Sequence, residues 1–289
     1  MKVCCACSQP FVGATWTCPT CGSVPASVGG HLAFSPALAV SGSGFSADHF
    51  AKLARNEERN FWFRSRNRLL VWTMRRYFPT ARSFFEIGCG TGYVLMGMQR
   101  ALPQVTLAGS EIYSVGLEFA AHRLPGIDLF QIDATSIPFT DEFDVIGAFD
   151  VLEHIKEDEQ VLQEMFKASR PGGGILVTVP QHMFLWSQAD VEAVHQRRYS
   201  ARELRTKIQR AGFEVVRISS FVSLLLPLMA AQRLSKRKPD PNYSVHKELA
   251  IGGFANWSME QLLTVERGLL RSGISFPAGG SLLAVARKR

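Results

Sequence analysis

The sequence predicts an α/β fold: a doubly wound, mostly parallel sheet with helices on both faces, preceded by a small N-terminal module. Short apolar runs rich in β-forming residues recur along the chain, and stretches long enough for helical crossovers separate them. A glycine-rich turn joins the first of these runs to a helical stretch. A Ser-Gly linker at residues 41–46 separates the almost uncharged residues 1–40 from the charged residues 47–289.

The size and composition of the chain exclude several classes of protein. Its 289 residues suffice for one large domain with a small appendage, and 46% hydrophobic with 20% charged residues exclude a disordered chain or a coiled coil. The net charge of +7 favours acidic partners but does not establish nucleic-acid binding. No apolar run reaches the roughly 18 residues of a membrane span, and a signal-peptide core is absent from the N-terminal residues. We therefore expect a cytoplasmic protein.

Four cysteines of the N-terminal module form two pairs, Cys4-x2-Cys7 and Cys18-x2-Cys21, with ten residues between them. Two such pairs place four thiolates around one tetrahedral Zn²⁺, which stabilises a segment with too little core to fold alone. We predict a closed, structural zinc ribbon with Cys4, Cys7, Cys18 and Cys21 as ligands. Cys5 competes with Cys4, but the Cys5-x-Cys7 spacing is rarer. A redox pair is the alternative interpretation.

The later elements follow from periodicity and capping signals. Helices are predicted at residues 46–59 and 61–77, the second ending before Pro79. Capping boxes at Ser200 and Ser258 predict the start of two further helices. The predicted strands cover residues 83–89, 105–112, 127–132, 143–149, 174–179, 213–218 and 282–286.

The turn after the first of these strands carries glycines at positions 88, 90 and 92. Glycines at a strand-to-helix turn let the backbone approach a ligand and leave helix N-terminal amides facing it. The spacing is G-x-G-x-G, whereas the dinucleotide fingerprint is G-x-G-x-x-G, so NAD is disfavoured. Glu111 lies about 20 residues further on, at the end of the next strand, where a carboxylate accepts the two hydroxyls of a ribose.

Together with four later motifs, this turn resembles the class I S-adenosylmethionine-dependent methyltransferases. The later motifs lie at residues 131–134, 143–155, 171–180 and 195–200, and the resemblance extends from about residue 47 to the C-terminus. His195-Gln-Arg-Arg-Tyr199 narrows it to the branch that contains ubiquinone-type and antibiotic- or glycan-modifying small-molecule methyltransferases. The resemblance implies a seven-stranded sheet and a set of residues at the S-adenosylmethionine site: Glu86, Gly88, Gly90, Gly92, Glu111, Ile112, Asp133, Ala134, Phe149 and Asp150.

The resulting hypothesis is methyl transfer to oxygen, nitrogen or carbon of a small biosynthetic intermediate, with carrier- or lipid-linked acceptors included. His195 and His154 are the candidate general bases, and His195 is preferred because it follows the fifth strand at the cofactor edge. The apolar stretch 221–234 followed by basic residues is compatible with a buried helix, a pocket lid or peripheral contact with a lipid surface. The acceptor, the role of the zinc module and the oligomeric state are left open by the sequence.

Three other functions compete with this one. An N-terminal zinc ribbon also resembles the 23S rRNA guanine methyltransferases, but the module lacks the Lys and Arg residues of an RNA-docking surface, so a nucleic-acid partner is disfavoured. A non-catalytic interaction protein on a degenerate fold is opposed by the intact glycines and Glu111. An NAD oxidoreductase is the remaining alternative.

Overall fold

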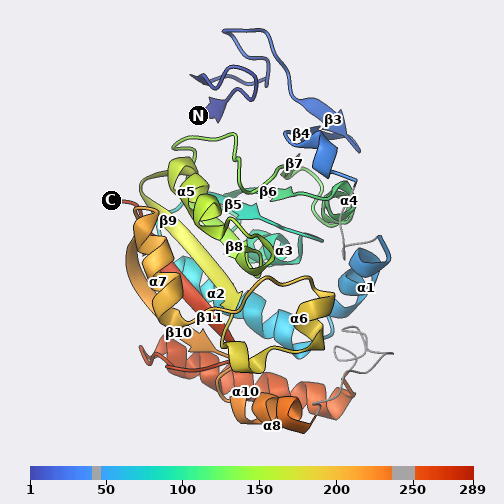
Figure 1. The fold of residues 1–289 in the computed structure, drawn as a ribbon, viewed down its shortest axis with the longest axis vertical. Helices are drawn as coiled ribbons and strands as arrows, with labels where there is room; N and C mark the ends of the chain where they lie inside the picture. The colour runs from blue at the N-terminus through green and yellow to red at the C-terminus, as the bar shows by residue number, and fades with distance from the viewer. Residues whose placement is uncertain (41–46, 236–250) are drawn as a thin grey trace.

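A computed structural model describes residues 1–40, 47–235 and 251–289, which are built around a nine-stranded mixed sheet (Figure 1). The strand order is β10-β11-β9-β8-β5-β6-β7-β4-β3. The strands are β3 (Ala26–Val28), β4 (His31–Ala33), β5 (Ser83–Ile87), β6 (Thr106–Glu111), β7 (Asp128–Gln131), β8 (Phe143–Phe149), β9 (Ser169–Pro180), β10 (Glu214–Phe221) and β11 (Ser281–Arg287). A separate two-stranded sheet pairs β1 (Lys2–Val3) with β2 (Pro10–Phe11).

The seven strands from β5 onward form the predicted doubly wound sheet. From β5 the chain adds β6 and β7 on one side and then crosses to β8 and β9 on the other, and all of these neighbours are parallel. The carboxyl ends of β5, β6, β7 and β8 therefore lie at one edge, and the direction of winding reverses between β5 and β8. Open α/β sheets bind ligands at such a reversal. The antiparallel strand β11 lies between β9 and β10.

Helices cover both faces of the sheet and enclose two hydrophobic cores (Figure 1). Phe84 points into the core beneath α2, α3, α4 and α10, whereas its neighbour Phe85 points into the core beneath α5 and α7. This alternation is the two-residue period of a strand buried on both faces. The helices are α1 (Ala47–Glu57), α2 (Phe61–Tyr77), α3 (Tyr93–Ala101), α4 (Ser114–Arg123), α5 (Asp158–Ala168), α6 (Gln188–Glu192), α7 (Ala201–Arg210), α8 (Leu226–Ser235) and α10 (Gly253–Arg271).

Local signals set most helix boundaries, with one exception. The predicted cap at Ser200 is confirmed, since its hydroxyl accepts a hydrogen bond from the Glu203 amide at 3.1 Å. The predicted start at Ser258 is wrong, because α10 begins at Gly253. The added first turn is held by Asn256, whose side-chain oxygen accepts a hydrogen bond from the Phe61 amide at 2.8 Å, so packing against α2 extends the helix. The predicted start at Ser46 lies outside the described residues.

The N-terminal residues add two strands to the sheet, which the sequence did not predict. The hairpin of β3 and β4 continues the sheet because β4 pairs in parallel with β7. Trp16 reaches the same edge and packs edge-on against Phe34, Phe130 and Phe139, with ring centroids 4.6, 5.9 and 5.5 Å away. The cysteine-rich segment thus rests on aromatic side chains of the sheet.

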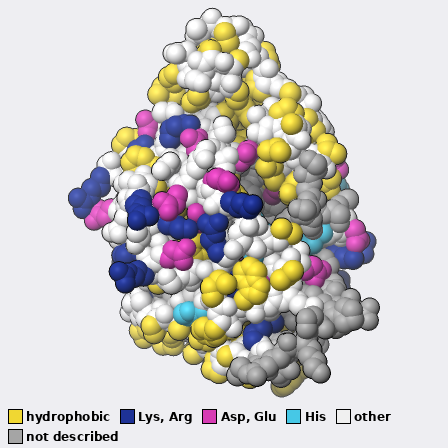
Figure 2. Space-filling view, viewed as in Figure 1, with side chains coloured by type: hydrophobic (Ala, Val, Ile, Leu, Met, Phe, Trp, Pro, Cys, Tyr) yellow, Lys and Arg dark blue, Asp and Glu magenta, His cyan; other side chains and the backbone are white. Residues whose placement is uncertain are grey.

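No helix in the described parts of the chain is both long enough and apolar enough to cross a bilayer. On the face drawn in Figure 2, basic and acidic side chains are interspersed over the middle of the molecule, whereas the N-terminal module above them shows mainly uncharged atoms.

Candidate functional site

The turn between β5 and α3 has the backbone geometry that the glycine spacing predicts. Gly88, Gly90 and Gly92 have φ values of +64°, +52° and +74°, which other residues rarely adopt. A Cβ at Gly88 would lie 2.6 Å from Val151, and one at Gly92 would lie 2.8 Å from Leu124, so these two glycines are required by packing within the protein. At Gly90 the nearest heavy atom, on the Phe50 ring, would be 4.0 Å away. Gly90 is therefore the position with room for a ligand.

Glu111 is held beside this turn by backbone amides. One carboxylate oxygen accepts a hydrogen bond from the Gly90 amide at 3.0 Å, and the other accepts from Ile112 at 2.9 Å and Tyr113 at 3.3 Å. Burial raises the pKa of Glu111, and these three hydrogen bonds oppose that rise. A carboxylate has about four lone-pair positions, so at least one remains for a ligand hydroxyl. The fold thus holds Glu111 against the glycine turn, and its role at a ribose stays a prediction.

Three more of the residues predicted to bind the cofactor, Asp133, Ala134 and Phe149, lie at the same edge of the sheet, at the ends of β7 and β8. Asp133 follows β7 and accepts a hydrogen bond from the Thr135 amide at 2.9 Å. The next residue, Ala134, is buried in the core. Phe149 packs its ring against Phe84, with centroids 6.4 Å apart, so its side chain serves the core and only its backbone reaches the edge.

Two further carboxylates lie at the strand ends, Asp150 half-buried and Glu86 buried. Asp150 directly follows β8, has a φ of +58° and forms an ion pair with Arg66 of α2. The Arg66 guanidinium also lies over the Trp62 ring, 4.3 Å from its centroid. Glu86 is 2% exposed, and its Oε2 has no hydrogen-bond partner among the described residues. Burial raises the pKa of Glu86 well above its ordinary value, and the charge of Arg66 opposes this rise.

The two predicted bases are brought together, although they are 41 positions apart in the sequence. The rings of His154 and His195 have centroids 4.6 Å apart and meet edge to face. His154 belongs to a short 3-10 turn, Leu152–His154, after β8. Burial and the charge of His195 lower the pKa of His154 to about 4, so His154 is neutral at pH 7. Their roles as bases stay predictions.

A buried carboxylate that the sequence analysis missed orients His195. Asp190 of α6 is fully buried and lies 2.9 Å from Nδ1 of His195, and it accepts a hydrogen bond from Nε of Arg198 at 2.7 Å. Although burial alone raises the pKa of Asp190, the hydrogen bonds from His195 and Arg198 lower it to about 2. Asp190 is therefore ionised, and Nδ1 of His195 donates to it. An acidic residue five positions before a candidate histidine was the available signal.

Four cysteine sulfurs gather in the N-terminal module. The Sγ atoms of Cys4 and Cys21 are 3.6 Å apart, those of Cys7 and Cys18 are 3.7 Å apart, and all four lie within 4.8 Å of one another. Tetrahedral zinc with Zn–S bonds of about 2.3 Å separates its sulfurs by about 3.8 Å. The sulfurs therefore fit a tetrahedral metal site. Cys5 is exposed and does not belong to this group.

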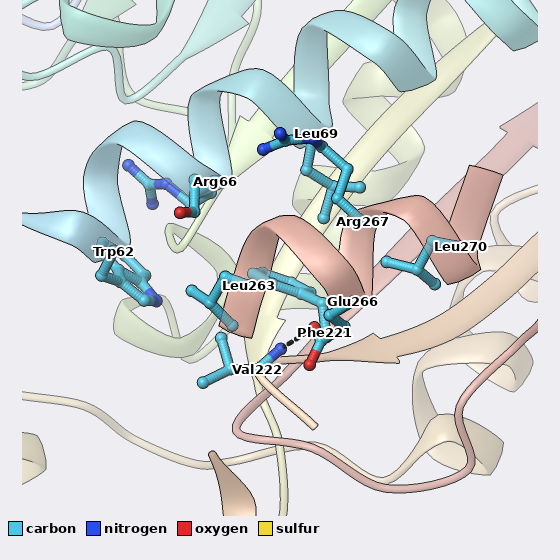
Figure 3. Close-up of a pocket in the computed structure, with 10 residues that line it drawn as sticks. Trp62, Arg66, Leu69, Phe221, Val222, Leu263, Glu266, Arg267 and Leu270 are labelled. Atoms are coloured by element: carbon cyan, nitrogen blue, oxygen red, sulfur yellow. Dashed lines mark hydrogen bonds between the residues drawn. The ribbon is translucent and has the colours of Figure 1, made fainter. Parts of the chain in front are cut away.

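A small pocket opens beside the Arg66–Asp150 pair, between α2, α10 and the end of β10 (Figure 3). Its wall is mainly apolar, with Glu266 as a structural carboxylate that accepts hydrogen bonds from the amides of Val222, Ser223 and Leu224 at 2.6, 2.6 and 2.8 Å. The pocket is lined by Trp62, Ser65, Arg66, Leu69, Phe221, Val222, Leu263, Glu266, Arg267 and Leu270.

Comparison with known proteins gives a family and several relatives. Residues 53–218 match the family described as "Methyltransferase domain". A Mycolicibacterium smegmatis protein named "probable S-adenosylmethionine-dependent methyltransferase" is 29% identical over 161 residues, 55% of this chain and 61% of the relative. Phthiotriol/phenolphthiotriol dimycocerosates methyltransferase 1 of Mycobacterium ulcerans is 28% identical over 45% of this chain and 50% of its own length. The matched region thus spans less than two thirds of each of these curated relatives.

Solved structures of low sequence identity share the fold. Phosphoethanolamine N-methyltransferase 2 of Haemonchus contortus, solved with S-adenosyl-L-methionine, has a TM-score of 0.56 at 13% identity and covers 86% of this chain and 58% of its own. The cyclase SpnF has a TM-score of 0.52 at 20% identity, and the match covers 80% of this chain and 84% of SpnF. Because one neighbour transfers methyl groups and another is named a cyclase, these likenesses establish the Rossmann-like methyltransferase fold and not the reaction.

Proposed function

Because this chain belongs to the methyltransferase-domain family through residues 53–218, we propose that it is a class I S-adenosylmethionine-dependent methyltransferase that acts on a small acceptor. The bound sulfonium supplies the methyl group, which the acceptor takes by in-line displacement from sulfur. The protein contributes alignment of the two reactants at the edge where β5, β6 and β8 end.

The observation that carries this proposal is the pairing of Glu111 with Gly90. The carboxylate is positioned by three amides and keeps acceptor capacity for ribose hydroxyls, while Gly90 leaves room for the methionine moiety. Asp133, at the end of the adjacent strand β7, is proposed to face the adenine amine. Glu86, Gly88, Gly92, Ile112, Ala134, Phe149 and Asp150 are proposed to complete the cofactor site through side chain or backbone.

Replacing Glu111 tests the cofactor assignment. Glu111→Ala removes a charge-assisted contact to two hydroxyls, so we expect the affinity for S-adenosylhomocysteine to fall about ten- to a hundredfold. Isothermal titration calorimetry measures this change. Glu118→Ala is the matched control, since Glu118 is an exposed carboxylate on the helix that follows. If Glu111→Ala binds as tightly as the parent while remaining folded, the cofactor does not lie here.

We propose that the acceptor is apolar. The pocket in Figure 3 is lined mainly by apolar side chains and adjoins Asp150 through Arg66. Large apolar side chains are also exposed on the neighbouring helices α8 and α10: Leu228, Phe254, Trp257, Leu262 and Val265. The Mycobacterium ulcerans relative is named for dimycocerosate acceptors. We propose a lipid-like or lipid-linked acceptor that reaches the site from this side.

The cysteine cluster is proposed to bind one structural Zn²⁺. Four thiolates close the coordination sphere, so a metal there has no open position for a reactant. We propose that residues 1–40 form a zinc-stabilised module, residues 41–46 a linker and residues 47–289 the catalytic domain. The packing of Trp16 on the β7 edge explains why the module stays in contact with that domain.

A further inference from the structure

A buried carboxylate without a partner lies next to the histidine pair. Glu153 is completely buried, and neither of its carboxylate oxygens has a hydrogen-bond partner among the described residues. Burying a carboxyl group without a hydrogen-bond partner destabilises the folded state, so such a group points to a ligand. A core position would be served better by an apolar residue of similar size.

The two histidines face the same point as Glu153. One carboxylate oxygen of Glu153 and one ring nitrogen each from His154 and His195 all lie within 4.8 Å of one another. Ligand atoms held about 2.1 Å from one cation are at most about 4.2 Å apart, so only a small inward movement would complete a site. Two imidazoles and one carboxylate on one side, with the other positions open, is the ligand set of several first-row divalent metals.

The surroundings hold His195 in the form that a metal needs. Nδ1 of His195 donates to Asp190, so its lone pair is on Nε2. A carboxylate behind a metal-binding histidine is the usual arrangement that fixes ring orientation and tautomer. Arg198 and the Ser187 amide, 2.7 and 2.8 Å from Asp190, hold that carboxylate in turn. The His195 side chain is 15% exposed, which gives the site a connection to the surface.

We propose that Glu153, His154 and His195 bind a divalent first-row cation, with Asp190 as the positioning residue behind His195. The site lies at the end of β8, next to β5, and Val151 of the same loop contacts Gly88 of the glycine turn. It is distinct from the cysteine cluster, which is closed and lies in the N-terminal module.

The role of the cation, unlike its binding, rests on the proposed function. A divalent cation lowers the pKa of an oxygen that it contacts, so an acceptor hydroxyl would lose its proton to water near neutral pH. The acceptor oxygen then forms a bond to the methyl carbon as the carbon–sulfur bond breaks and its electron pair returns to sulfur. A histidine that binds the metal does not serve as general base, so metal binding replaces the predicted role of His195 and His154 as bases. Because the cation acts on an oxygen, the proposal implies an acceptor with a hydroxyl group.

Manganese titration tests the binding site separately from the zinc site. Mn²⁺ prefers oxygen and imidazole ligands to thiolates, so the cysteine cluster, loaded with zinc, competes little. Electron paramagnetic resonance of the full chain should show one bound Mn²⁺, and spin-echo modulation should show coupling to imidazole nitrogen. Glu153→Gln should weaken binding at least about a hundredfold, since losing even an outer partner costs about 10- to 100-fold.

Controls keep the result interpretable. Glu157→Gln, an exposed carboxylate of the same loop, should bind Mn²⁺ like the parent. Asp190→Asn should weaken binding about 10- to 100-fold without removing the nitrogen coupling. Binding of S-adenosylhomocysteine reports whether each variant is folded and whether the proposed function survives. Absence of Mn²⁺ binding below about millimolar concentration, or parental binding by Glu153→Gln, would overturn the inference and return His195 to the role of base.

Discussion

Glu86 is a buried carboxyl group that makes the stability of the folded protein depend on pH. Its pKa is raised well above the ordinary value by burial, with Arg66 opposing. At pH values between the pKa of Glu86 in the unfolded chain and its raised pKa in the folded protein, the folded protein therefore binds more protons. Stability contributed by this group is present at low pH and is lost as pH rises from about 4.3 through the raised pKa.

The variant Glu86→Gln removes this titration. The free energy of unfolding of the variant, relative to that of the parent, should increase as the pH rises above about 4.3, because only the parent must ionise a buried group. Urea denaturation at several pH values measures the difference. Glu118→Gln, at an exposed position, should give a constant difference. A constant difference for Glu86→Gln as well would show that Glu86 titrates normally.

At the residue level, spacing alone located the turn between strand and helix and the strand that ends at Glu111, whereas the cofactor roles of these residues stay predictions. Gly88, Gly90 and Gly92 have the positive φ values that their pattern implies, and Glu111 contacts the turn from the next strand. Asp190 was missed although it lies only five positions before His195, because the sequence does not show which nearby acidic residue is buried against the histidine. The unpartnered state of Glu153 was missed because it depends on what residues elsewhere in the fold do not supply.

At the scale of elements, predictions based on periodicity were confirmed. α2 has the predicted bounds, and each predicted strand has a counterpart in the sheet. The predicted start of α10 was wrong because Asn256 holds the first turn against α2. This contact joins Asn256 to Phe61, about 195 positions away in the sequence. The β3–β4 hairpin was missed for a related reason: strands of three residues have too few positions to show a period, and only pairing with β7 defines them.

The N-terminal module gives the element-scale prediction. A variant with Cys18→Ser and Cys21→Ser should lose about one equivalent of zinc, because two of four thiolates are removed. Metal analysis of the purified chain measures the loss. Hydrogen exchange of amides in β3 and β4 should quicken, whereas amides of β5 and β8 should stay protected, since the module packs on the β7 edge of the sheet.

Cys5→Ser is the control for this variant, because Cys5 is exposed and lies outside the sulfur cluster. It should retain the full equivalent of zinc. Loss of zinc from Cys5→Ser would show that Cys5, and not Cys4, is the zinc ligand. Full zinc content in the Cys18→Ser/Cys21→Ser variant would refute the proposed zinc site.

At the scale of the whole molecule, fold class was predictable because several independent signals agree. The strand spacing, the glycine turn and the later motifs all require a parallel sheet with crossovers, and the nine-stranded sheet contains the seven strands they imply. The acceptor was not predictable, since no recurring sequence pattern marks the side chains that would contact it.

The charge of the molecule favours the proposed lipid-like acceptor over RNA. RNA binding needs basic residues gathered in one stripe, and it weakens steeply with salt. Here the excess of basic residues is only seven, charges of both signs are interspersed on the face in Figure 2, and the N-terminal module contributes little positive charge. The exposed apolar side chains of α8 and α10 instead offer a surface to an apolar acceptor.

This contrast gives a prediction about the methylated product. When the full chain is incubated with S-adenosylmethionine carrying a tritiated methyl group, label should enter the lipid fraction of a cell extract and not purified ribosomal RNA. Glu111→Ala should reduce the lipid label about ten- to a hundredfold at limiting cofactor, which ties the label to the proposed site. If the parent labels RNA and the Glu111→Ala variant does not, the acceptor is RNA and not a lipid. The same cofactor site would then serve a polyanion despite the scattered charge.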